Sequence, residues 1–290
     1  MTAPTIAESQ RKPSDDEIDV YGITHTGKVR KENQDHFLIC SLKRQMVVRQ
    51  TSLPTIDKVT TQSERLAFIM MVADGVGGGA KGEEASRLAV EAATQYVQRS
   101  MRCYYAASAE DDEEFFEALR EAALGCHGEL VRRAEKEPEC RGMATTLTLY
   151  LGVWPCAYLL QVGDSRCYIL EDGQLTQITR DQTMAQELIN LGVMNPADAK
   201  RSRLGHTLSS TIGGRNTEPV VTRRNQKWGN VALLCSDGLT QHVSDERIRE
   251  RLATMKSSRQ ACEDLLKDAL AGGGTDNITL IVARALPGKR

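Results

Sequence analysis

The chain has 290 residues, and its 37 Lys and Arg against 39 Asp and Glu give a formal net charge of −2. This balance excludes a nucleic-acid binder that works by neutralising phosphates, because neither the total nor any segment supplies a basic excess. With 40% apolar and 26% charged residues the composition is typical of a soluble globular protein.

Several negative features of the sequence bear on its setting. No stretch approaches the roughly 20 consecutive apolar residues of a membrane-spanning helix, and the first residues lack the apolar core of a secretory signal. The 8 cysteines form no C-x-x-C pair, so we expect reduced core residues in a cytoplasmic protein that binds neither membrane nor nucleic acid. Nothing demands more than a monomer.

The first half of the chain combines a tail, strands and long helices. Residues 1–17 are polar and aperiodic, which favours a mobile tail. Residues 66–73 are continuously apolar, which predicts a strand buried on both faces that ends at Asp74-Gly75. The polar residues 41–65 before it are typical of a long hairpin. Helical spacing of apolar residues predicts helices over 82–100 and 111–136.

The second half is richer in strands. Short β-rich runs with intervening Gly-Asp and Asp-Gly turns predict antiparallel strands, followed by a short helix over 182–192 and a polar loop. Strands and helices come in blocks, which indicates an α+β class with mostly antiparallel sheets in a single domain over 18–290. The predicted strands cover 145–153, 157–162, 167–170, 174–178, 231–235 and 278–285, with further helices from Ser244 and over 258–271.

Aspartates mark the ends of several predicted core strands. Asp74, Asp164 and Asp237 each follow one, and Asp276 precedes one. Carboxylates that share a site repel one another unless a cation lies between them, and all-oxygen ligation selects hard ions such as Mg²⁺ or Mn²⁺. Ordinary turn chemistry explains any single Asp-Gly pair better, but the repeated pattern favours a metal site.

The glycine-rich segment 75–80 suggests two nucleotide-binding motifs. GVGGGA fits the dinucleotide pattern G-x-G-x-x-G/A after a strand, but Asp74 would face the pyrophosphate. The Walker pattern fails because Ala80 replaces the glycine that should precede Lys81.

Covalent nucleophiles find little support. Cys126 and Arg132 have the C-x₅-R spacing of cysteine-dependent phosphatases, but they fall inside a predicted amphipathic helix. Ser165, in GDSRC, lacks the last glycine of a nucleophile elbow.

A charged segment precedes the first apolar strand. It contains Arg30, Asn33, Gln34 and Asp35, and a solvated surface loop is one interpretation. The other is phosphate binding, because a planar guanidinium beside a metal centre can hold two phosphate oxygens.

Seven segments in order carry a family resemblance: VRKENQD, VADGVGG, GMATTLTL, VGDSRCY, LTQITRDQT, LLCSDGL and GGTDNITLIVA. Together they resemble the metal-dependent serine/threonine protein phosphatases of type 2C in their short bacterial form. The similarity runs from Tyr21 to Ala285.

The resemblance implies a fold and an activity. The fold is a β-sandwich of two mostly antiparallel sheets flanked by helix pairs. The activity is hydrolysis of phosphoserine and phosphothreonine in proteins, by direct attack of a water or hydroxide that bridges two Mn²⁺ or Mg²⁺ ions. The implied partners are phosphoprotein substrates and a serine/threonine kinase.

The resemblance also assigns roles to residues. Asp74 resembles the aspartate that bridges the two ions, the Gly75 carbonyl a further ligand, and Asp237 and Asp276 the remaining ligands of the first ion. Arg30 resembles the arginine that holds the substrate phosphate. Asp164 is similar to the aspartate that joins Asp237 around a third, weaker ion, and Asp35 supplies a carboxylate near the second.

Two departures from the family pattern concern activity. Gln34 stands beside Asp35 where many members have Glu, which places a neutral amide near the second ion. Val76 stands where some members have a histidine proposed as general acid. These departures leave open a catalytically weak or silent module that binds a phosphoprotein or a regulatory partner.

Residues 184–206 align with the flap that borders the cleft in this family. Arg201, Arg203 and His206 could contact a phosphoprotein there, and a solvated loop is the alternative.

Overall fold

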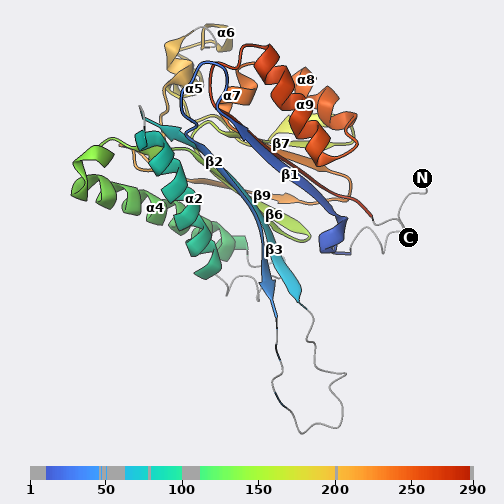
Figure 1. Cartoon of the computed structure of the whole chain (residues 1–290). Coiled ribbons are helices and arrows are strands. Elements are labelled where there is room, and N and C mark those ends of the chain that lie inside the picture. Colours follow the sequence, from blue (N-terminus) through green and yellow to red (C-terminus); the bar gives the residue numbers. More distant parts are fainter. Residues whose placement is uncertain are drawn as a thin grey trace.

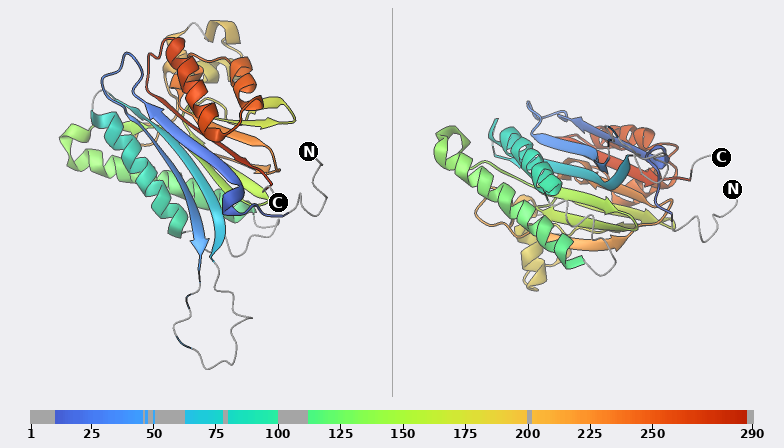
Figure 2. Two further views of the ribbon diagram at one scale, coloured as in Figure 1. Left: turned by 45° about the vertical axis from the view of Figure 1, so that its right-hand side comes forward. Right: turned by 90° about the horizontal axis from the view of Figure 1, so that it is seen from below.

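Two antiparallel sheets stack face to face, and helices cover both outer faces of the stack (Figures 1 and 2). The computed structural model describes residues 11–45, 47, 50, 63–77, 80–99, 112–199 and 202–287. Its layers confirm the predicted α+β sandwich.

The first sheet has five strands in the order β1-β11-β10-β7-β8. Its last strand in sequence, β11, lies between β1 and β10, so the first and last strands of the domain are neighbours at one edge of the sheet. The bounds are β1 (Ile18–His25), β7 (Arg166–Glu171), β8 (Gln174–Gln177), β10 (Val231–Cys235) and β11 (Ile278–Ala285).

The second sheet has six strands in the order β2-β3-β5-β6-β9, with β4 paired to the end of β3. Neighbouring strands of this sheet are antiparallel. The predicted antiparallel turn at Asp172-Gly173 joins β7 to β8 in the first sheet. The bounds are β2 (Asp35–Arg44), β3 (Glu64–Val76), β4 (Ala144–Thr145), β5 (Leu147–Val153), β6 (Cys156–Val162) and β9 (Val220–Asn225). No pattern in the sequence predicted β1 or β9.

One helix pair packs on each sheet. Helices α2 (Ala80–Arg99) and α4 (Asp112–Lys136) cover the six-stranded sheet, and α8 (Asp245–Ala253) and α9 (Ser258–Ala271) cover the other (Figure 1). The shorter elements are η1 (Asp15–Glu17), η2 (Pro138–Cys140), α5 (Met184–Asn190), α6 (Pro196–Ala199), η3 (Arg203–His206) and α7 (Asp237–Thr240).

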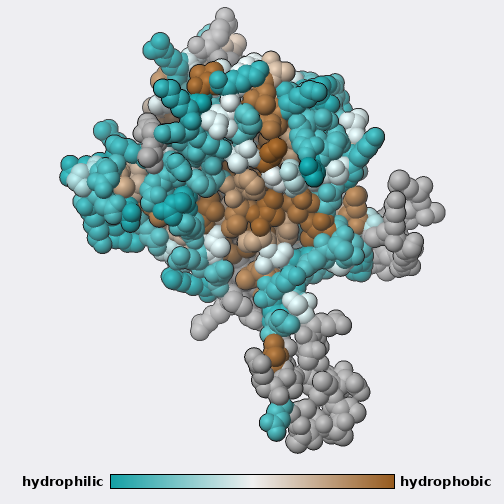
Figure 3. Space-filling model, viewed as in Figure 1, coloured by the Kyte–Doolittle hydropathy of each residue, from teal (hydrophilic) through white to brown (hydrophobic). Residues whose placement is uncertain are grey.

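The core has three apolar layers, one under each helix pair and one between the sheets. The inter-sheet layer includes Met70, Leu234 and Ile281. Figure 3 shows apolar atoms across the middle of one face, where β1 and β2 form an open edge of the sandwich. The partly buried Val20 and Phe37 of the inter-sheet layer lie on these strands.

The strand expected to end at Ala73 is longer than the sequence predicts. β3 continues through Asp74 to Val76, because Gly75 and Val76 pair with Thr145 and Ala144 of β4. Asp74 therefore lies inside a hydrogen-bonded strand, and its backbone position is fixed on both sides.

Part of the predicted mobile tail is packed against the domain. Arg11 forms an ion pair with Glu17 at 2.6 Å, and Pro13 and Glu17 are buried. For residues 11–17 the expectation of a mobile segment was therefore wrong. Residues 1–10 and most of the expected hairpin over 41–65 lie outside the described residues.

The cysteines among the described residues are all free, and they are buried except for the half-buried Cys40. This confirms the predicted reduced core thiols, while Cys103 lies outside the description. Across the described ranges, none of the helices combines the length and apolar character needed to cross a membrane.

Candidate metal centre

Asp35 and Asp74 lie opposite each other on neighbouring strands, at the start of β2 and near the end of β3. Asp35 is buried, and its Oδ2 accepts a hydrogen bond from Ser236 Oγ at 2.7 Å. Its Oδ1 is also buried and has no hydrogen-bond partner among the described residues. An unsatisfied buried carboxylate oxygen is costly, so this atom fits a site that receives a cation.

The backbone of Asp74 is held by two threonines. Its amide donates to Thr146 Oγ1 at 2.9 Å, and its carbonyl oxygen accepts from Thr145 Oγ1 at 2.8 Å and from the Thr146 amide at 2.9 Å. Thr146 Oγ1 also lies 2.8 Å from Ser165 Oγ, next to the buried Asp164. This network ties the end of β3 to the turn that carries Asp164.

The glycines after Asp74 and Asp237 are required by close packing. A Cβ on Gly75 would lie 2.1 Å from the carbonyl oxygen of Gly82, and one on Gly238 would lie 1.9 Å from that of Asn277. Neither glycine has a positive φ. Ordinary turn chemistry, the alternative explanation, therefore does not account for the glycine in these two Asp-Gly pairs.

Asp237 and Asp276 come from adjacent strands of the first sheet. Asp237 is the first residue of α7, directly after β10, and its Oδ2 accepts from Gln241 Nε2 at 2.6 Å. Asp276 precedes β11, and its Oδ1 accepts from the Asn277 amide at 2.9 Å. The pairing of β10 with β11 brings the two carboxylates together.

The carboxylates perturb one another. Burial, followed by repulsion from Asp35 and Asp237, raises the pKa of Asp74 well above its ordinary value. Burial also raises the pKa of Asp164, with Asp237 as the next cause, and it raises the pKa of Asp35 to about 7. Such a cluster takes up protons unless a cation neutralises it.

The carboxylate side chains do not form a closed ligand shell in this structure. Within the described ranges, no three His, Cys, Asp or Glu side chains are grouped closely enough to hold an ion. The buried unpaired oxygen of Asp35 and the mutual repulsion nevertheless fit a divalent cation, because hard oxygen donors of like charge need one.

Arg30 lies at the edge of this cluster, on the loop between β1 and β2. Its Nη2 forms an ion pair with Asp276 Oδ2 at 2.7 Å, and 54% of its side chain is exposed. The hydrogen bond to Asp276 raises the pKa of Arg30. An exposed guanidinium beside a carboxylate cluster can exchange its partner for an incoming phosphate.

Asn277 is a site residue that the sequence analysis missed. Its Nδ2 donates to the carbonyl oxygens of Thr26 and Glu32, each at 2.9 Å, and so holds both ends of the loop that carries Arg30. The available signal was its place in GGTDNITL, directly after Asp276.

Gln34 and Val76, the two departures from the family pattern, both lie at the end of β3. Gln34 Nε2 donates to the Gly77 carbonyl at 3.1 Å, and the Gln34 carbonyl accepts from the Gly75 amide at 3.1 Å. Gln34 therefore connects the β2 loop to the end of β3. Val76 is partly exposed beside it.

Residues 184–206, which the sequence predicts as a flap, include His206. Burial and the neighbouring Asp276 raise the pKa of Asp237, while hydrogen bonds with Gln241 and Asp74 and then the charge of His206 lower it. His206 therefore lies within electrostatic range of Asp237. Arg203 lies in the same 3₁₀ turn, η3, whereas Arg201 falls outside the described residues.

Comparison with known proteins decides the family. The family model described as "Protein phosphatase 2C" matches residues 44–272, more than half of the chain. The chain belongs to the protein phosphatase 2C family. This confirms the resemblance drawn from the seven motifs.

Members of the family with similar sequences come from bacteria. The chain is 37% identical over 220 residues to the serine/threonine protein phosphatase PstP of Mycobacterium tuberculosis, over 75% of this chain and 40% of that protein. It is 31% identical to the serine/threonine phosphatase stp of Listeria monocytogenes, over 76% of this chain and 86% of that one. The match thus spans less than half the length of the first of these curated relatives.

Solved structures agree with the fold. The Mycobacterium tuberculosis phosphatase PstP/Ppp superposes with a TM-score of 0.74 at 30% identity, over 93% of this chain and 99% of that one. The catalytic domain of PstP in complex with two manganese ions gives a TM-score of 0.70 at 31% identity, over 93% and 99% of the two chains.

Proposed function

We propose that this chain is a metal-dependent protein phosphatase that hydrolyses phosphoserine and phosphothreonine in proteins. The observation that carries the proposal is the cluster of buried and half-buried carboxylates with Arg30 bound at its edge. The names of the bacterial relatives, which are serine/threonine phosphatases, support the same reaction.

The ligand assignment is also a proposal. Asp74, the Gly75 carbonyl, Asp237 and Asp276 would hold two Mn²⁺ or Mg²⁺ ions, and Asp35 would add its unpaired Oδ1. Asp164 would join Asp237 around a third, weaker ion. When bound, the ions would lower the pKa of the attacking water and neutralise charge on the phosphoryl oxygens.

The chain's own residues bind and orient the substrate. Arg30 would release Asp276 and hold two phosphate oxygens through its planar fork. The sequence offers no convincing covalent nucleophile, which favours direct transfer of the phosphoryl group to water. Gln34, Thr145 and Thr146 keep Asp74 and its strand end in place.

We also propose a setting for this activity. Residues 18–290 would act as one catalytic domain, with residues 184–206 as the flap over which a phosphoprotein is recognised. The protein would work as a cytoplasmic monomer on the targets of a serine/threonine kinase.

The test is hydrolysis of a phosphothreonine peptide and of p-nitrophenyl phosphate with Mn²⁺, Mg²⁺ or EDTA. We expect turnover with Mn²⁺ that is abolished by EDTA, and at least about a 100-fold lower kcat in Asp237→Asn with the fold intact. Asp172→Asn is the matched control, because Asp172 occupies an exposed turn with φ 49° that asparagine also adopts. It should keep full activity.

Two results would contradict the proposal. Unchanged hydrolysis by Asp237→Asn would reject the site, and no turnover by a folded sample with either metal would reject the activity. The second result would favour the silent phosphoprotein-binding module that Gln34 and Val76 leave open.

A further inference from the structure

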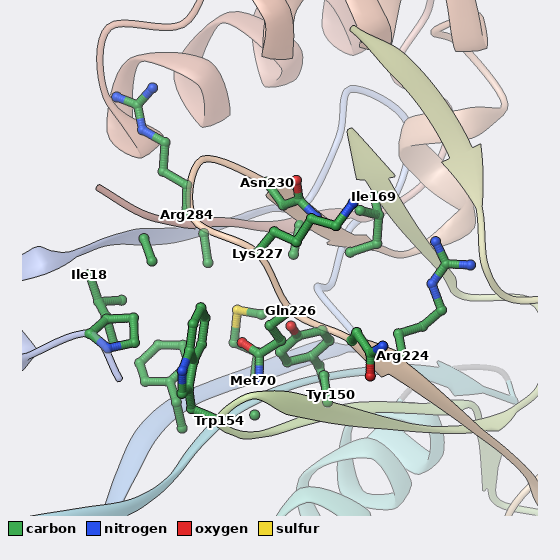
Figure 4. A pocket seen from close by; sticks show the side chains of 18 of the residues that line it. Ile18, Met70, Tyr150, Trp154, Ile169, Arg224, Gln226, Lys227, Asn230 and Arg284 are labelled. Carbon is green, nitrogen blue, oxygen red and sulfur yellow. The ribbon is translucent and has the colours of Figure 1, made fainter. Parts of the chain in front are cut away.

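A cavity of about 90 Å³ lies between the two sheets, at the end of the sandwich opposite the carboxylate cluster (Figure 4). It is lined by the first residues of β1, β6 and β10 and by the last residues of β5, β9 and β11. The aspartates lie at the other ends of β3, β10 and β11, so the cavity is separate from the candidate metal centre.

Small side chains leave this space open. Gly152, Ala157, Ala232 and Ala283 line the cavity on facing strands. Two stacked sheets lie about 10 Å apart, a gap that larger side chains must fill. The rest of the inter-sheet layer is filled by residues such as Val72, Leu234 and Ile281, while this end is not.

The remaining walls are mostly apolar and aromatic. Phe68, Tyr150 and Trp154 line one side, and Ile169 lies on the opposite sheet (Figure 4). The Tyr150 hydroxyl has no hydrogen bond in the described part of the chain, and burial raises the pKa of this side chain. A tyrosine hydroxyl in such a wall usually bonds to a partner, so it is available to a ligand.

The cavity lining is rich in cationic side chains. The cations are Lys12, Arg65, Arg224, Lys227 and Arg284, against a single acidic residue, Glu171. Lys227 pairs with Glu171, Arg65 with Asp15, and Arg284 with Asp19 at 3.0 Å.

Arg224 differs from the other cations. Arg224 lies opposite Ala157 in the β9–β6 ladder. Its guanidinium makes neither a hydrogen bond nor an ion pair within the described ranges. An exposed guanidinium at the edge of an apolar cavity is a recognition group for an anionic head.

We propose that this cavity binds a small amphipathic anion, with a short alkyl chain between the sheets and an anionic head group at Arg224. A volume of about 90 Å³ is the space that an alkyl chain of about five carbons fills. The apolar walls exclude ligands that are polar throughout, such as sugars and nucleotides, because these would lose hydration without finding partners. The cationic side chains disfavour a positively charged amphiphile. A carboxylate and a phosphate head share the required chemistry, and they are distinguished by experiment.

The chain offers a local readout of binding. It has two tryptophans, and Trp154 lines the cavity with Trp228 in edge contact at 5.9 Å between ring centroids. Titration with hexanoate or hexyl phosphate, below their micelle concentrations, should change tryptophan fluorescence saturably. The anion that binds more tightly identifies the head group. Hexan-1-ol and hexyltrimethylammonium test the charge requirement and should bind at least about 10-fold more weakly.

Variants locate the binding site. Arg224→Gln should weaken binding of the better anion about 10-fold and leave binding of hexan-1-ol unchanged. Ala285→Phe, at the partly exposed rim of the cavity, should abolish binding of both. Arg249→Gln removes the same charge from the exposed surface of α8 and should bind as the unaltered protein does.

Three outcomes would overturn the proposal. They are no saturable binding of either anion up to about 20 mM, equal binding of hexyltrimethylammonium, or equal binding by Arg224→Gln and the unaltered protein. Because Arg224 is a surface residue without a partner in the described chain, Arg224→Gln should fold even where Ala285→Phe does not.

Discussion

Asn277 Oδ1 accepts a hydrogen bond from the Gln34 backbone amide at 2.9 Å, across 243 residues of sequence. The same side chain donates through Nδ2 to the carbonyls of Thr26 and Glu32. One buried amide therefore fixes the loop that carries Arg30 and the start of β2, where Asp35 lies. It is a positioning residue for one group on a loop, Arg30, and one on a strand, Asp35.

Replacing Asn277 with Ala should lower kcat/KM for a phosphothreonine peptide at least about 10-fold, because small displacements of site residues are costly to catalysis. The free energy of unfolding should fall by about 1–3 kcal/mol, since backbone groups lose their partners. Steady-state kinetics and urea denaturation measure the two effects. Asn225→Ala, at the exposed end of β9, should change neither by much, and full activity of Asn277→Ala would contradict the positioning role.

Replacing Arg30 with Gln should raise KM for a phosphopeptide about 10- to 100-fold, because the charged fork that holds the phosphate is lost. Binding of Mn²⁺ should not weaken, since Asp276 loses a competing cation. Kinetics and calorimetric titration with Mn²⁺ measure these effects. Arg259→Gln removes an exposed arginine that pairs with Glu263 on α9 and serves as the control. An unchanged KM would remove Arg30 from the phosphate site.

Asp268 links α9 to α8 and should make stability depend on pH. Hydrogen bonds from Arg251, at 2.7 and 2.8 Å, and from Arg247 lower its pKa in the folded protein. A lowered folded pKa gives stability that is present above the unfolded value of about 4 and is lost as pH falls below it.

Asp268→Asn should therefore lower the free energy of unfolding by about 1–2 kcal/mol at pH 7, and the difference should shrink below pH 4. Urea denaturation of both proteins at pH 7, 4 and 3 measures it. Asp172→Asn makes the same change in an exposed turn and is the control for the substitution itself at pH 7. If the difference in free energy of unfolding between the two proteins stays constant down to pH 3, packing and not charge is its cause.

Two glycines of α4 should respond oppositely to alanine. A Cβ on Gly125 would lie 2.2 Å from Tyr96 Cζ of α2, whereas the nearest atom to one on Gly128 is Arg132 Nη1 at 3.6 Å. Gly125→Ala should destabilise the protein by about 1–3 kcal/mol through overpacking. Gly128→Ala should stabilise it by up to about 1 kcal/mol, because alanine favours a helix interior. Thermal denaturation of the two variants tests the packing of α2 on α4. Equal changes in stability for Gly125→Ala and Gly128→Ala would contradict this packing.

The sequence by itself determined the fold class, the positions of most strands and the motifs that mark the family. Apolar runs and helical spacing are local properties, so they identified β10, β11 and α9 with their full lengths. The aspartates were visible because they adjoin those runs. The extension of β3 was not visible, since it depends on pairing with Thr145 from a distant part of the chain.

Only the tertiary structure decided which strands are neighbours and what they bring together. The register that sets Asp35 opposite Asp74, the contact of Gly238 with Asn277 and the cavity beside Trp154 depend on backbones that meet across more than 30 residues. Local periodicity carries no information about such long-range pairing, because the same alternation of side chains is compatible with many sheet orders. The packing of the two sheets selects one of these orders, and with it the site.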